Sequence, residues 1–155
     1  MWDFKKIYCA VIMAVLCLML ALVPTKVISE PYIGLGTSVV NSELKTNEFG
    51  YRWGDWDLSV NLQDGGNTKN GYQKQVDIVS FSKIIRPKWA IGPCDTILRV
   101  GVANVNNSAL VGQKNFRLGA GCDFGPIEVE WSHISSADIN KTNTGIDVIQ
   151  FRLKI

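Results

Sequence analysis

Residues 56–63 read WDLSVNLQ, with an apolar side chain at every second position and a polar one between. A period of two is typical of a β-strand that has one apolar and one polar face. Gly54 and Asp55 directly precede this segment, and the pair suits a two-residue hairpin turn with Gly at its first central position. The stretch therefore predicts the returning strand of a β-hairpin.

The same pattern recurs after Glu30, where no segment has a helical period of useful length. The segment 74–85 alternates poorly, so its register stays open. We expect eight strands, at 31–40, 46–53, 56–63, 74–85, 95–105, 114–124, 126–136 and 145–155. The chain is therefore predicted to be a single all-β domain.

The connections between these strands alternate in length. Tight turns lie at 54–55 and 124–126, and the connection at 86–93 on the same side is moderately longer. The others are polar and mostly longer, and they lie at 41–45, 64–73, 106–113 and 137–144. Short turns on one side, long loops on the other and an even strand number are typical of bacterial outer-membrane proteins. We therefore expect an eight-stranded antiparallel up-and-down transmembrane β-barrel with both termini on the periplasmic side.

A soluble barrel with an apolar interior would show the same alternation with its faces reversed. The aromatic residues favour the membrane barrel, because several gather near the proposed periplasmic end as an interfacial girdle does. These residues are Tyr32, Trp53, Trp56, Trp89 and Phe124.

The N-terminal segment is typical of a secretory signal. Two lysines precede an apolar run at 7–23, and Val27 and Ser29 suit the −3 and −1 positions of a cleavage site. We expect a signal peptide at 1–29 and an outer-membrane barrel domain at 30–155. An uncleaved membrane anchor is the alternative, because the run approaches the length of a spanning helix.

The charge balance argues against a nucleic-acid partner. Residues 1–29 hold three lysines and one aspartate, so the formal net charge of +2 falls to zero without them. A nucleic-acid binder needs a concentrated basic face.

Two of the four cysteines, Cys94 and Cys122, lie outside the predicted signal. A hairpin folded near Asn107 and Ser108 would place them opposite each other, so they are a candidate disulfide in an oxidising compartment. Two unrelated reduced thiols remain the alternative. The chain has a single histidine and no clustered cysteines, so we expect no metal site.

The only histidine lies in the segment 126–136, where it shares a face with apolar residues. His133 and Ser135 alternate with Glu130 and Ser132, so both fall on the predicted lipid-facing side. A hairpin centred near residue 140 places Asp147 of the last strand opposite His133, and a slip of two residues places it opposite Ser135. The three side chains are therefore predicted to converge near the extracellular rim.

These residue types match the parts of a nucleophilic acyl-transfer site. Ser135 would be the nucleophile, His133 the general base, and Asp147 the group that orients the imidazole. The alternative is that His133 and Ser135 are interfacial polar residues and that Asp147 marks the end of a strand.

The C-terminal part of the chain also resembles a known family. The stretches HISSA at 133–137 and NTGID at 143–147 are similar to the signature of the PagL-like lipid A 3-O-deacylases, also called acyloxyacyl-hydrolase-like outer-membrane barrels. The resemblance implies the same roles for Ser135, His133 and Asp147.

The sequence departs from this family at three positions. Ser136 stands where Asn is common, Asp138 stands where Gly is common, and Asp147 stands where Glu is frequent. The resemblance makes Ser136, Ala137 and Asp138 candidates for the oxyanion hole. The departures at Ser136 and Asp138 favour the main alternative, a non-enzymatic small outer-membrane barrel with a structural, adhesive or surface-masking role.

The resemblance implies an outer-membrane serine esterase that removes an ester-linked 3-hydroxyacyl chain from lipid A, with its site at the extracellular leaflet of a Gram-negative cell. We expect no cofactor, and the expected partners are the membrane and lipid A or another outer-leaflet lipid. A phospholipid substrate and a soluble lipid-binding barrel are further alternatives.

Overall fold

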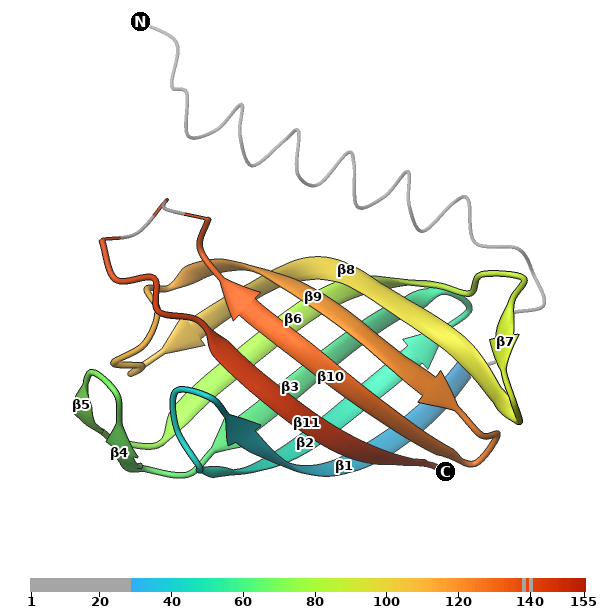
Figure 1. Ribbon diagram of the computed structural model, residues 1–155, viewed down its shortest axis with the longest axis horizontal. Coiled ribbons are helices and arrows are strands. Elements are labelled where there is room, and N and C mark those ends of the chain that lie inside the picture. Colours follow the sequence, from blue (N-terminus) through green and yellow to red (C-terminus); the bar gives the residue numbers. More distant parts are fainter. Residues whose placement is uncertain (1–28, 138, 140) are drawn as a thin grey trace, which may run out of the picture.

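Eight long antiparallel strands close into a barrel (Figure 1). The computed structural model describes residues 29–137, 139 and 141–155. The barrel strands are β1 (Ser29–Val39), β2 (Lys45–Trp53), β3 (Trp56–Gln63), β6 (Val76–Ile85), β8 (Cys94–Asn106), β9 (Lys114–Asp123), β10 (Ile127–Ser135) and β11 (Ile146–Lys154). Pairing of β1 with β11 and of β6 with β8 completes the ring. The predicted barrel is confirmed, and each strand boundary lies within two residues of its predicted position.

Three short strands were not predicted. β4 (Gly66–Thr68) and β5 (Gly71–Gln73) form a separate hairpin between β3 and β6, and β7 (Ala90–Ile91) pairs with the start of β8. Within the described residues, no helix is long and apolar enough to cross a membrane. The predicted signal segment lies outside the described residues except for Ser29, which begins β1.

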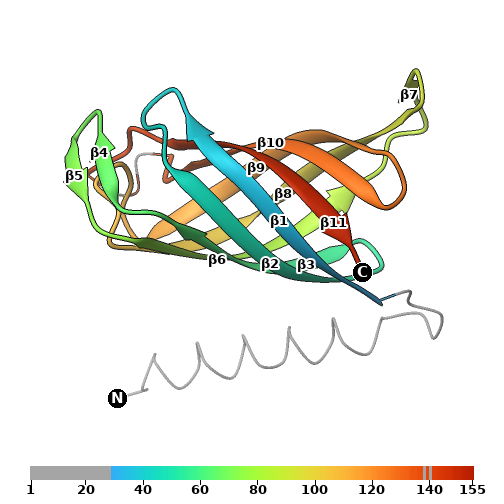
Figure 2. The ribbon, with the colours of Figure 1, turned by 90° about the horizontal axis from the view of Figure 1, so that it is seen from below.

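The two ends of the barrel differ (Figures 1 and 2). The β4–β5 hairpin and the β10–β11 connection lie at one end, which we call the long-loop end. β7 and the C-terminus lie at the other, which we call the short-turn end. As predicted from the sequence, the longer connections therefore lie at one end of the barrel and the shorter ones at the other.

The polar faces of the strands point into the barrel. In β3, Asp57, Ser59 and Asn61 are buried, whereas Leu58 and Val60 are exposed. The soluble alternative, with an apolar interior and a polar outer surface, is therefore wrong. An apolar exterior is what the hydrocarbon region of a bilayer requires of a barrel.

The middle of the barrel holds a network of buried charges. Arg152 illustrates it, because its guanidinium lies 2.7 Å from Glu128 and 3.0 Å from Glu130 and also pairs with Glu48. The formal charges balance, since the network contains four arginines and four carboxylates. They are Arg52, Arg99, Arg117, Arg152, Glu48, Asp57, Glu128 and Glu130, and all are almost fully buried. A buried charge is tolerated when opposite charges and hydrogen bonds surround it.

Tyr32 packs into this network across Gly50. Its hydroxyl donates to Asp57 at 3.0 Å, and the guanidinium groups of Arg52 and Arg152 lie 5.5 and 5.6 Å from its ring centre. A Cβ at position 50 would come within 2.1 Å of the ring. Gly50 is therefore required for Tyr32 to lie flat over the neighbouring strand.

Toward the long-loop end the interior becomes apolar. A cluster of buried residues closes the barrel there, formed by Val76, Ile78, Ala103, Val105, Leu110, Val111, Ile134, Ile146 and Val148. This cluster explains the poor alternation of the segment 74–85. Val76 and Ile78 face inward into the cluster, while Ser80 and Ser82 of the same face reach the polar part of the interior.

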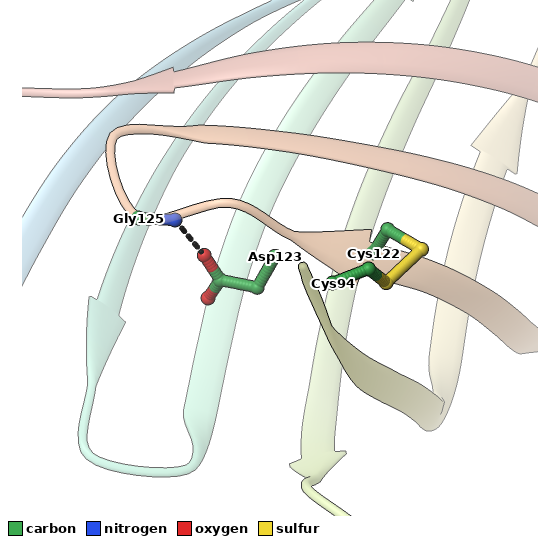
Figure 3. The surroundings of a disulfide bond; sticks show 4 residues. All are labelled: Cys94, Cys122, Asp123 and Gly125. Carbon is green, nitrogen blue, oxygen red and sulfur yellow. Dashed lines mark hydrogen bonds between the residues drawn. A yellow bond between two sulfur atoms is a disulfide. The ribbon is translucent and has the colours of Figure 1, made fainter. Parts of the chain in front are cut away.

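Cys94 and Cys122 form a disulfide between β8 and β9, with their Cα atoms 5.2 Å apart (Figure 3). The predicted register was wrong by two residues, because Thr96 is the residue directly opposite Cys122. The hairpin is centred near residue 109, one position further along the chain than expected. The disulfide therefore joins diagonal neighbours. In the adjoining turn, the Gly125 amide donates to the carboxylate of Asp123 at 2.9 Å (Figure 3).

Replacing Arg152 by Leu is expected to lower the free energy of unfolding by about 3–5 kcal/mol. Arg152 pairs with Glu48, Glu128 and Glu130, so its removal leaves one buried negative charge in excess among the four carboxylates and three remaining arginines. Urea unfolding of the barrel in lipid vesicles measures this loss. The control is Arg86→Leu. Arg86 pairs with Asp55 at an exposed turn, where an ion pair contributes at most about 1 kcal/mol. Equal losses in the two variants would contradict the importance of the buried network.

Candidate active site

His133 and Asp147 lie opposite each other on neighbouring strands. β10 and β11 pair in a register that makes these two residues direct partners, as the hairpin centred near residue 140 predicted. His133 Nδ1 lies 2.9 Å from Asp147 Oδ1. Because an ionised carboxylate can only accept a hydrogen bond, this pairing assigns the ring hydrogen to Nδ1 and leaves Nε2 as an acceptor.

The pair lies on the outer surface of the barrel among apolar side chains. The His133 side chain is 32% exposed and that of Asp147 is 11% exposed. Trp131 stacks beside the imidazole, with ring centres 6.3 Å apart and planes inclined by 24°. Leu118 of β9 is the partner of His133 on its other side, and it is half exposed. The polar pair is therefore partly shielded and borders the apolar band.

Ser135 is the last residue of β10 and lies two positions beyond His133 on the same face. Its side chain is half-buried, and its partner on β9 is Phe116. Pairing of β10 with β11 ends one residue earlier, at Ile134 and Ile146. Ser135 therefore lies where the sheet gives way to the β10–β11 loop.

The backbone after Ser135 turns sharply. Ser136 is fully buried, and its amide donates to the side-chain oxygen of Asn143 at 2.8 Å. Ala137 is exposed and has a left-handed φ of 45°, a conformation uncommon for a residue with a side chain. Asp138 lies outside the described residues. The loop thus folds back toward the start of β11 directly beside Ser135.

Residues 32–155 match the family model described as Lipid A 3-O-deacylase (PagL). The chain belongs to this family. A solved structure described as "Crystal structure of the outer membrane enzyme PagL" has a TM-score of 0.60 and 20% identity, and the match covers 81% of this chain and 98% of that chain. This likeness supports the fold. Comparison with the curated proteins finds no significant match.

The structure accommodates two departures of this PagL-family chain from the expected pattern. Asp147 has one methylene fewer than the frequent Glu, yet its carboxylate reaches His133 at hydrogen-bond distance. Ser136 replaces the common Asn. Its backbone amide donates to the side-chain oxygen of Asn143, which lies across the loop. Only the tertiary structure reveals this contact, because seven residues separate the two positions.

Gly145 forms the wall behind the imidazole. It has a left-handed φ of 87°, and a Cβ there would lie 2.7 Å from Cε1 of His133. Real Cβ atoms do not approach another atom this closely, so any side chain would displace the ring. The sequence placed Gly145 at the start of a strand and gave no sign of this contact.

Replacing Gly145 by Ala is expected to break the hydrogen bond between His133 Nδ1 and Asp147, since the added Cβ pushes the ring away. Proton NMR of the chain in detergent micelles measures this effect. His133 is the only histidine, so a single downfield Nδ1–H signal reports the bond. The control is Gly125→Ala, which has a similar φ of 89° but open space around the added Cβ. An unchanged signal in both variants would contradict the close contact.

Proposed function

We propose that this member of the PagL family hydrolyses the ester that links a 3-hydroxyacyl chain to lipid A, and that it does so with Ser135 as nucleophile. The observation that carries the proposal is the outward-facing hydrogen bond between His133 and Asp147, which lies two residues from Ser135 on the apolar wall of the barrel. A substrate with acyl chains in a membrane can reach such a site sideways, so the site needs no internal pocket.

The reaction follows the order of a serine hydrolase. Nε2 of His133 takes the proton of Ser135 Oγ as that oxygen attacks the ester carbonyl. The tetrahedral intermediate collapses when the bond to the sugar oxygen breaks, and His133 returns the proton to that oxygen. Water then attacks the acyl-enzyme with the same base and releases a 3-hydroxy fatty acid. Asp147 holds the imidazole in place and stabilises its charged form.

The negative oxygen of the intermediate needs hydrogen-bond donors. The amide of Ser136 already donates to Asn143, which favours the amide of Ala137 among the described candidates. The left-handed φ of Ala137 reverses the chain directly after Ser135 and Ser136, which supports this assignment. Asp138 remains a further candidate.

We also propose that the long-loop end faces the outside of the cell. Long loops on the outer side and short turns on the periplasmic side are the rule in bacterial outer-membrane barrels. His133 and Asp147 then lie at the level of the outer leaflet, where lipid A is found. Residues 1–29 would serve as the export signal that brings the barrel domain at 30–155 to this membrane.

Replacing Ser135 by Ala is expected to abolish the loss of one 3-hydroxyacyl chain from lipid A in Gram-negative cells that express the protein. Mass spectrometry of extracted lipid A measures the chain loss directly. The matched control is Ser136→Ala. This change keeps the backbone amide and removes only a buried hydroxyl without a hydrogen-bond partner, so activity should be retained.

Three results would contradict the proposal. Intact lipid A from cells with folded wild-type barrel in the outer membrane would favour the non-enzymatic alternative. Continued deacylation by the Ser135 variant would move the nucleophile elsewhere. Loss of a phospholipid acyl chain instead would change the substrate class.

Replacing Asp147 by Asn is expected to lower kcat by about 10³–10⁴, because an amide can hold the imidazole in the wrong tautomer. Asp147→Glu keeps the charge and should retain much more activity, although its longer side chain must adjust within a distance now spanned at 2.9 Å. Deacylation rates on purified lipid A in detergent measure both effects. Equal activity of the Asn variant and the wild type would remove Asp147 from the mechanism.

A further inference from the structure

Thr144 is held by hydrogen bonds from several loops at once. Its amide donates to the carbonyl of Leu110 at 2.8 Å, its carbonyl accepts from Asn41 at 3.1 Å, and its hydroxyl accepts from Asn70 at 2.6 Å. The three partners come from the β8–β9, β1–β2 and β3–β6 connections. Thr144 is therefore the point where the loops of the long-loop end meet.

Asn41 makes the most buried of these contacts. Its side-chain amide donates to the carbonyls of both Thr144 and Gly145, each at 3.1 Å. Asn41 is almost fully buried and lies more than a hundred residues away in sequence. These two bonds fix the backbone of Gly145, which is the wall behind the His133 ring.

The turn that presents Asn41 is strained. Val40 directly precedes it and has a left-handed φ of 71°, which is an outlier for a β-branched residue. Its side chain is 83% exposed, so packing of Val40 does not explain the conformation. Strain of this kind clusters at functional sites. Here the turn directs the Asn41 side chain toward Thr144 and Gly145.

Asn70 links the β4–β5 hairpin to the same point. Its side-chain amide also donates to the carbonyl of Ala109 at 3.1 Å. The backbone amide of the neighbouring Lys69 donates to the carbonyl of Asn41 at 2.9 Å. The β4–β5 hairpin, the β1–β2 loop and the β10–β11 connection lie together at one end of the barrel (Figure 2). The contacts thus form one connected network around Thr144.

This hydrogen-bond network adjoins the candidate active site. Gly145 lies beside the His133 ring with no room for a Cβ between them, and Asp147 follows two residues later. Asp147 is paired with His133 on one side and with Val39, just before the strained turn, on the other. The position of the carboxylate and of the ring wall therefore depends on how the 143–145 segment is held.

We propose that Asn41 is a positioning residue for the reaction, with Asn70 in a supporting role. Its two hydrogen bonds hold Thr144 and Gly145 so that the His133 ring stays aligned with Asp147. The catalytic part of this inference rests on the proposed function, whereas the structural part concerns only the hydrogen bond between His133 and Asp147.

The test replaces Asn41 by Asp, which has the same shape but cannot donate to the two carbonyls. We expect kcat for lipid A deacylation to fall about ten- to a hundredfold, since small displacements of catalytic groups have effects of this size. KM should stay within about twofold, because the Asn41 side chain is largely buried and acts through His133. The downfield Nδ1–H signal of His133 should weaken or disappear, which a loss of stability alone would not cause in the folded barrel.

The control is Asn67→Asp. Asn67 is exposed and lies in β4, in the same hairpin as Asn70, and this change adds the same charge at the same end of the barrel. If Asn41→Asp does not fold, Asn70→Ala provides the second variant. Asn70 is exposed, so its replacement should preserve the fold and produce a smaller change in the same direction.

The outcomes separate this proposal from the proposed function. A lower kcat with a weakened Nδ1–H signal supports it. Unchanged kcat and signal in an active Asn41→Asp variant would overturn it, as would a rise in KM alone. If the wild type does not deacylate lipid A but Asn41→Asp still loses the signal, the positioning role stands and the proposed function fails.

Discussion

The buried network of arginines and carboxylates is the constraint on which the rest of the structure depends. Arg99, Arg117 and Arg152 each bridge carboxylates from more than one strand, so the network joins distant parts of the sheet across the barrel interior. Charges of this number cannot face hydrocarbon. Their burial therefore fixes which face of the six strands that carry them points inward. The opposite faces, including that of His133 and Ser135, must then point outward.

The candidate active site follows from this constraint at a chemical cost. His133 and Asp147 are polar groups on a surface otherwise lined by residues such as Trp131 and Leu118. Each satisfies part of the other's hydrogen-bonding capacity, which reduces the cost of placing them beside lipid. Such a placement is useful for an ester whose acyl chains never leave the membrane. In the proposed function, the barrel serves as a rigid wall and the chemistry takes place on its outer side.

Beyond the end of the sheet, contacts within the loops hold the residues around Ser135 in place. Ser135 lies one residue beyond the last pair of β10 and β11, so strand pairing alone does not fix its surroundings. Two asparagine side chains hold the backbone there instead. Asn41 donates to the carbonyls of Thr144 and Gly145, and Asn143 accepts from the amide of Ser136. The apolar cluster around Leu110 and Ile146 supports the same region from inside the barrel. The outer face that carries His133 and Ser135 and the apolar cluster inside the barrel thus belong to one packed region.

The sequence alone determined the strands and the grouping of His133, Ser135 and Asp147 on one face, because both depend on a period of two. The structure decided that Asp147 pairs with His133 and not with Ser135, and that the apolar faces point outward. The sequence placed Cys122 opposite the wrong residue, since the centre of a long loop is not encoded in local alternation. It gave no sign of Asn41 or of the contact between Gly145 and His133. Those contacts join segments that are distant in sequence or depend on a backbone angle, so only closure of the barrel, which brings the last strand beside the first, decided them.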